Sequence, residues 1–153
     1  MRKLTKRYII KSLDKLNLSE PIRYERYYIN DCLRIQIKNN KFEKEILDEN
    51  NNITEKIEIT ENEFCKLRKN AYSEIIRDSY ILLEDKRVSI KKYFGKYIGL
   101  YRVEVTFNSA EEENKYIKES WMGNEITNSP LAFDRYLSKL SENEFKEELK
   151  KYL

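Results

Sequence analysis

Hydrophobic and polar residues alternate strictly along several short stretches of the chain. In residues 33–38 every odd position is apolar and every even position carries a long polar side chain. Residues 56–60 and 102–107 show the same alternation. Because successive side chains of a β-strand point to opposite faces of a sheet, each stretch predicts a strand with one apolar and one polar face.

Short polar segments separate these strands. Asn39 and Asn40 lie between the strand at 33–38 and the next one, and residues 48–52 form a second connection. Connections of this length are typical of antiparallel hairpins. The full set of predicted strands covers residues 3–10, 22–29, 33–38, 41–47, 53–59, 74–83, 87–94 and 99–107. The pattern therefore predicts about eight antiparallel strands.

Helices are indicated by their capping sequences. A Thr or Ser followed three residues later by Glu occurs at Thr60, Ser109 and Ser141, and such pairs cap the first turn of a helix. We therefore expect helices over residues 61–71, 110–118 and 142–152, and a fourth over 131–140. No linker or repeat divides the chain, so residues 1–153 are expected to form a single α+β domain, mainly antiparallel β.

The polar faces of the predicted strands are rich in charge. Basic residues share one parity on successive strands: Lys3, Arg7, Arg23, Arg34, Lys38, Lys56, Arg77, Lys91 and Arg102. The carboxylates that accompany them are Glu25, Glu43, Glu45, Glu58 and Glu104. If the sheet closes with this face inward, the charges line a lumen that holds water or an anion, because desolvating unpaired charges is costly. If the sheet stays open, the same face is solvated, and alternation alone fits both arrangements.

Composition removes several classes of function. The 30 basic and 27 acidic residues give a net charge of only +3, too balanced for a protein that coats DNA. The absence of histidine excludes histidine-based triads and histidine-ligated zinc. Cys32 and Cys65 lack metal-ligand spacing and fit a reducing compartment. With no long apolar run and no signal-peptide pattern, we expect a cytoplasmic protein without a membrane partner.

The C-terminal third contains a distinctive order of residues. Gly99-Leu100-x-x-x-Glu104-Val105 leads to Trp121-Met122-Gly123-Asn124-Glu125-Ile126-Thr127, and then to Leu131-Ala132-Phe133-x-x-Tyr136-Leu137. This order resembles the CYTH superfamily (class IV adenylyl cyclases and thiamine triphosphatases), also called triphosphate tunnel metalloenzymes. Residues 33–42 are similar to the Leu-Arg-Ile-Arg hairpin of that family. The likeness covers about residues 1–140.

The resemblance implies both a fold and an activity. The fold would be a closed, eight-stranded β-tunnel with peripheral helices. Family members bind triphosphates, nucleotides or polyphosphate through inward Arg and Lys side chains. They hold Mg²⁺ or Mn²⁺ through inward glutamates, and they either hydrolyse the triphosphate or cyclise ATP.

The chain departs from the family pattern where the metal ligands are expected. The Glu-x-Glu-x-Lys signature of the first strand is replaced by Lys-Leu-Thr-Lys-Arg at residues 3–7. On the strand at 53–59 the expected inward residues are Lys56 and Glu58, so one inward carboxylate remains. On a later strand, Lys91 occupies the position of a family aspartate. A lysine ammonium repels a divalent cation but attracts phosphate. We therefore expect metal-assisted hydrolysis to be lost and phosphate binding to be kept.

The first hypothesis is a pseudoenzyme that senses or sequesters a nucleotide or another phosphorylated ligand without a cofactor. Arginines would anchor the phosphates, because their planar donor groups match phosphate oxygens. Tyr27 and Tyr93 lie on the expected inward parity and could stack a base. The predicted ligand-binding residues are Arg7, Arg34, Gln36, Lys56, Glu58, Arg77, Lys91, Tyr93, Arg102 and Glu104.

The alternative hypothesis is a metal-dependent enzyme of the CYTH type. It would be a triphosphate hydrolase or, less readily, a nucleotidyl cyclase, with Mg²⁺ or Mn²⁺ held by Glu58 and Glu104. Glu43 and Glu45 could add ligands, although ion pairing with Lys41, Lys56 or Arg34 across the hairpins is the preferred explanation for them. A third hypothesis is a protein-interaction module with a vestigial tunnel. The sequence specifies neither the base nor the number of phosphates, and it leaves open whether two barrels pack as a homodimer.

Overall fold

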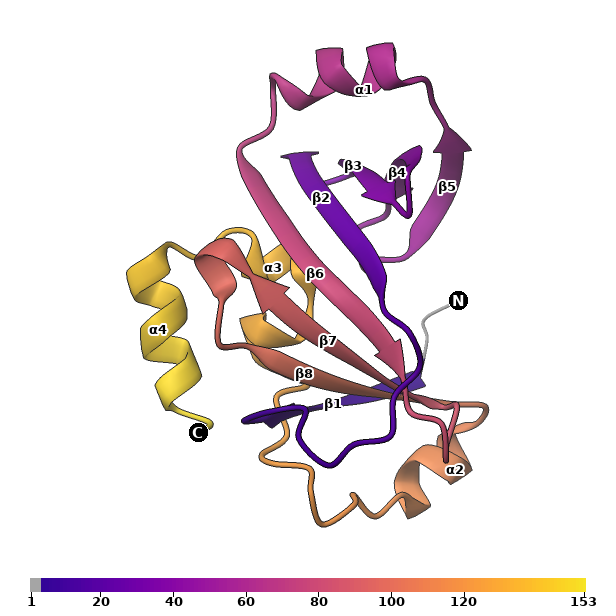
Figure 1. Cartoon of the computed structure of the whole chain (residues 1–153), viewed down its shortest axis with the longest axis vertical. Coiled ribbons are helices and arrows are strands. Elements are labelled where there is room, and N and C mark those ends of the chain that lie inside the picture. Colours follow the sequence, from indigo (N-terminus) through magenta and orange to yellow (C-terminus); the bar gives the residue numbers. More distant parts are fainter. Residues whose placement is uncertain (1–3) are drawn as a thin grey trace.

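Eight antiparallel strands form one sheet in the computed structural model, which describes residues 4–153 (Figure 1). The strands are β1 (Leu4–Ile10), β2 (Ile22–Asn30), β3 (Leu33–Lys38), β4 (Lys41–Leu47), β5 (Ile53–Glu58), β6 (Ser73–Ile81), β7 (Val88–Phe94) and β8 (Tyr101–Phe107). Their order across the sheet is β1-β8-β7-β6-β2-β3-β4-β5. The predicted set of strands and the α+β class are confirmed, and Lys3 lies outside the described residues.

The sheet is open at the level of backbone pairing. Strands β1 and β5 are its two edges, and within residues 4–153 no ladder joins them. The predicted closure into a barrel is therefore not confirmed. The edge of β1 is covered by the segment 123–127, in which the Gly123 amide donates to the Ile9 carbonyl at 2.8 Å and the Ile126 amide to the Arg7 carbonyl at 2.8 Å. A Cβ at Gly123 would overlap that Ile9 carbonyl oxygen, so glycine permits the close approach.

The helices begin at the predicted caps but are shorter than expected. The α-helices are α1 (Glu61–Arg68), α2 (Ala110–Lys115), α3 (Asp134–Leu137) and α4 (Glu142–Lys150). Thr60, Ser109 and Ser141 each accept a backbone N–H in the first turn, and at Ser141 the capping box is reciprocal. The expected helix over 131–140 is instead a 3₁₀ turn, η2 (Pro130–Ala132), followed by the single turn of α3. None of these helices has the length and apolar character needed to span a membrane.

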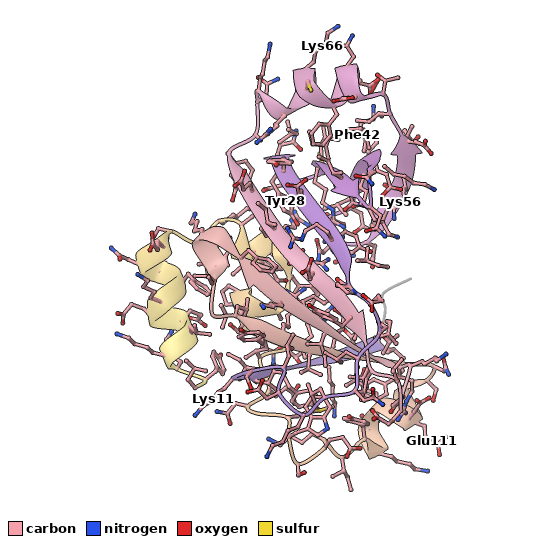
Figure 2. The ribbon with its side chains drawn as sticks, in the orientation of Figure 1. Lys11, Tyr28, Phe42, Lys56, Lys66 and Glu111 are labelled. Carbon is pink, nitrogen blue, oxygen red and sulfur yellow. The ribbon has the colours of Figure 1, made fainter. Side chains whose placement is uncertain are left out.

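Helix α1 and the segment that follows α2 cover the outer face of the sheet. Phe42 lies under α1 (Figure 2), with its ring centroid 5.1 Å from that of Phe64 on the helix. Tyr27 packs against the same Phe64 ring at 5.7 Å. The prediction that Tyr27 points inward is therefore wrong, and it is a core residue of the outer face. Beneath the segment that follows α2, Val103 and Val105 are buried in a second outer cluster.

The inner face of the sheet changes from charged to apolar along the strands. An apolar or aromatic residue stands two positions from each of five basic residues and therefore on the same face. These residues are Ile9 after Arg7, Tyr28 after Arg26, Ile75 before Arg77, Tyr93 after Lys91, and Leu100 before Arg102. These five side chains are buried together with Leu131 and Leu137. One end of the lumen is therefore filled core, and only the other end presents charges.

Candidate functional site

A cavity of about 950 Å³ occupies the charged end of the inner face. Six strands contribute the basic side chains of its wall, which are Arg7, Arg26, Arg34, Arg77, Lys91 and Arg102. The acidic residues of the wall are Glu49, Glu104 and Asp134. The segments 49–53 and 127–134, which lie outside the paired strands for most of their length, complete the lining of the cavity. With six basic residues against three acidic ones, the wall is suited to an anion.

Asp134, the first residue of α3, is the centre of the densest group of charges. Its Oδ2 accepts from Arg26 Nη1 at 2.8 Å and from Arg77 Nε at 2.9 Å. Its Oδ1 lies 3.3 Å from Arg102 Nη1 and accepts from the Tyr93 hydroxyl at 2.5 Å. Burial by itself would raise the pKa of this carboxyl, but the three guanidinium groups hold the pKa well below its usual range.

A second buried ion pair links β3 to β4 and β5. Arg34 Nε donates to Glu45 Oε1 at 2.8 Å, and Lys56 Nζ lies 3.3 Å from Glu45 Oε2. Arg34 also donates to the Tyr28 hydroxyl at 3.1 Å. Glu45 is fully buried. Water therefore cannot replace its carboxylate as the hydrogen-bond partner of Arg34.

Glu104 and Lys91 form a third charged group, next to Arg7. Arg7 Nε lies 3.5 Å from Glu104 Oε2, and Lys91 Nζ donates to Ser89 Oγ at 2.6 Å. Burial would raise the pKa of Glu104, but Lys91, Arg7 and Arg102 together lower that pKa to about 2. Burial lowers the pKa of Lys91 to about 7, an effect that Glu104 opposes and Arg77 and Arg102 reinforce.

Two arginines of the wall retain unused donors. The Nε groups of Arg7 and Arg102 are buried and have no hydrogen-bond partner within residues 4–153. Most buried donors in proteins are hydrogen-bonded, so an unpaired guanidinium N–H needs an explanation. Both arginines lie on neighbouring strands, because β1 pairs with β8, and both line the cavity. The Nε of Arg7 faces the Glu104 carboxylate at 3.5 Å, beyond a normal hydrogen bond.

The predicted site residues divide into two groups. The structure brings Arg7, Arg34, Arg77, Lys91, Arg102 and Glu104 into the wall of the cavity. Gln36, Lys56, Glu58 and Tyr93 lie outside it.

Each residue of the second group has another environment. Gln36 is buried between Arg26 Nε and Glu43 Oε1, at 2.9 and 2.8 Å. Lys56 and Glu58 lie on the edge strand β5 (Figure 2 labels Lys56), and the Lys56 side chain is 42% exposed. Tyr93 belongs to the apolar end of the lumen and contacts only Asp134 through its hydroxyl. Its ring is therefore not available to stack a base.

Sequence reasoning missed Arg26 and Asp134. The expected inward parity of β2 is wrong, because Arg23 lies on the outer face and donates to Asp78 Oδ1 at 2.5 Å. Residues 22–28 carry polar groups on both parities, so alternation does not decide their direction. Asp134 lies outside the strands. The sequence gives one indication of Asp134, which is that an aspartate stands among the apolar residues of the Leu131–Leu137 segment.

The acidic residues do not fit the divalent-cation centre that the family resemblance implies. Within residues 4–153 no three acidic or cysteine side chains gather as metal ligands would. Glu104 lies between Lys91 and Arg7, and Glu58 is outside the cavity. Mg²⁺ and Mn²⁺ require oxygen ligands that are free of competing cations. Glu58 and Glu104 therefore do not form the metal pair of the alternative hypothesis.

Known structures share this architecture. No protein-family model matches the chain, and no curated protein matches its sequence. A crystal structure of the hypothetical protein NE1496 superimposes with a TM-score of 0.74 and 16% identity, covering 92% of this chain and 99% of that one. A second, titled as the inorganic triphosphatase NE1496, gives a TM-score of 0.72 and 16% identity, covering 90% and 95%. At this identity the similarity establishes the fold alone: the chain shares the fold of NE1496, which agrees with the fold that the resemblance predicted.

Proposed function

We propose that the cavity binds a condensed phosphate chain, such as inorganic triphosphate or the triphosphate of a nucleotide, through its arginines and without a metal ion. The observation that carries the proposal is the wall of the cavity, in which six basic residues, five of them arginines, stand against three acidic ones. Guanidinium groups form strong, charge-assisted hydrogen bonds with phosphate oxygens. A chain of phosphates presents several such oxygens in a row, which suits donors that come from six different strands.

The fold neighbour favours a second candidate function. NE1496 is described as an inorganic triphosphatase, so hydrolysis of triphosphate is the alternative. Its usual requirement is a metal ion that neutralises developing charge and activates water. The carboxylates of this chain are engaged with arginine and lysine, and for that reason we propose retention of the ligand in preference to hydrolysis. A protein that binds without turnover would sense or sequester its ligand.

A thermal-unfolding panel separates the two functions. Inorganic triphosphate, pyrophosphate and ATP are each added in EDTA and then in Mg²⁺, and released phosphate is measured in the same samples. We expect stabilisation by triphosphate in EDTA, with the ligand recovered intact. A ligand at a hundred times its dissociation constant contributes about 2.7 kcal/mol, a shift that is easily measured. Stabilisation only with Mg²⁺, accompanied by phosphate release, would establish hydrolysis, and no stabilisation would reject both functions.

Affinity for triphosphate is expected to fall as pH rises above 7. The pKa of Lys91 is about 7 in the empty cavity, and a bound phosphate would raise it. Binding is then accompanied by proton uptake above pH 7, and it weakens by at most about tenfold per pH unit until the bound-state pKa is passed. Calorimetric titration at several pH values in EDTA measures the effect.

Matched lysine variants isolate this pH dependence. Lys91→Met should bind more weakly at pH 6 and lose the additional decline above pH 7. Lys92→Met changes the neighbouring lysine on the opposite face of β7 and should behave as wild type. The protonation of the ligand contributes equally to all three titrations. Parallel pH profiles for wild type and Lys91→Met would show that Lys91 does not contact the ligand.

A further inference from the structure

The carboxylate of Asp134 lies among the arginines, where a bound anion would otherwise lie. Its two carboxylate oxygens contact Arg26, Arg77 and Arg102, three of the basic residues of the wall. These contacts come from α3, which lies outside the sheet, and not from a neighbouring strand. Only 4% of Asp134 is exposed. The arginines are therefore already partly neutralised by a group that belongs to the chain.

We infer that Asp134 is an intramolecular competitor for the phosphate-binding arginines, and that it limits the affinity of the cavity for phosphate anions. The inference rests on the proposed function. A carboxylate and a phosphate accept hydrogen bonds from the same guanidinium donors. A phosphate group that enters the cluster must therefore take donors from Asp134.

The alternative is that Asp134 only orients the arginines, and the two roles predict opposite changes in affinity. Replacing Asp134 by asparagine keeps the shape of the side chain and removes its charge. Three buried guanidinium groups then lose their carboxylate, so the empty protein becomes less stable. A bound phosphate would supply the missing negative charge, so competition predicts tighter binding. A purely orienting role predicts weaker binding, because the arginines become less ordered.

Asp78→Asn is the matched control. Asp78 is also a buried aspartate paired with an arginine, since Arg23 Nε donates to its Oδ1 at 2.5 Å. It lies on the outer face of β6 and does not line the cavity. Asp78→Asn should therefore lower the melting temperature without changing the affinity for triphosphate.

Calorimetric titration with inorganic triphosphate and with inorganic phosphate, both in EDTA, tests the inference. We expect Asp134→Asn to melt at a lower temperature than wild type and to bind both anions roughly tenfold to a hundredfold more tightly. Unchanged or weaker binding by folded Asp134→Asn would overturn the inference while the proposed function stands. Failure of wild type and Asp134→Asn alike to bind triphosphate would instead reject the proposed function.

Hydrogen exchange on the wild-type protein keeps the inference testable if Asp134→Asn does not fold. Competition requires Asp134 to yield donors when triphosphate binds, which loosens α3. We expect amides of residues 134–138 to exchange faster with saturating triphosphate, while those of α1 stay unchanged. Slower or unaltered exchange over residues 134–138 would show that triphosphate and Asp134 do not compete.

Discussion

Replacing Arg102 with methionine is expected to weaken the binding of inorganic triphosphate by about tenfold to a hundredfold. Arg102 is only 3% exposed, lines the cavity and keeps its Nε donor unpaired. A hydrogen bond to a charged group contributes about 1.5–3 kcal/mol, which corresponds to that range of affinity. Methionine fills a similar length with apolar atoms, so the side chain continues to pack. Isothermal titration calorimetry in EDTA measures the change.

The control for Arg102→Met is Arg23→Met on the outer face of the sheet. Arg23 is also an arginine in a strand and is paired with a buried aspartate, Asp78. It does not line the cavity, so its replacement should leave the affinity as it is in wild type. Equal weakening by both variants would point to a general loss of positive charge. Unchanged affinity of Arg102→Met would remove Arg102 from the binding site.

Replacing Glu45 with leucine is expected to cost about 3–5 kcal/mol of unfolding free energy, since it leaves Arg34 buried without its carboxylate. The double variant Arg34→Met/Glu45→Leu should recover most of this loss, because an apolar pair can replace a buried ion pair at little cost. Denaturant-induced unfolding of wild type, Glu45→Leu, Arg34→Met and the double variant gives the coupling free energy. Additive losses in the double variant would show that Arg34 and Glu45 do not stabilise one another.

Acid should weaken this ion pair in a way that identifies Glu45. Burial raises the pKa of Glu45, but Arg34 and Arg26 outweigh that effect and hold the pKa below its ordinary value. The contribution is therefore present at neutral pH and is lost as pH falls through the lowered pKa of the folded state. The double variant lacks Glu45, so its stability should decline less steeply in acid than that of wild type.

The strands and the helix caps were predictable because each depends on neighbours in the chain. Alternation also identified the correct face of β1, β3 and β8, which is why Arg7, Arg34 and Arg102 were placed together. It failed on β2, where Arg23 and Arg26 offer a basic residue to either face. Short-range pattern carries no information about which of them meets Gln36 on the neighbouring strand β3 and Asp134 of α3.

Two further features depend on tertiary structure alone. An open and a closed sheet have the same alternation, so the absence of a ladder between β1 and β5 left no trace in the pattern. The apolar end of the lumen was missed as well, because Tyr93 and Ile9 become core only when Leu131 and Leu137 pack against them. Asp134 enters the cavity with the same segment. Neither the packing of the Leu131–Leu137 segment on the sheet nor the position of Asp134 among the arginines could therefore be predicted from the sequence.

The order of strands across the sheet has a consequence for how the molecule assembles during synthesis. Strands β2 to β5 pair through neighbouring hairpins, so they can form as soon as they are made. Strand β1 comes first in the chain but pairs with β8, with Leu4 opposite Phe107. It must wait for nearly all of the sheet, and long-range pairing of this kind slows folding. Arg7 and Arg102 can therefore meet only after β8 has been made, so the wall of the cavity is completed late.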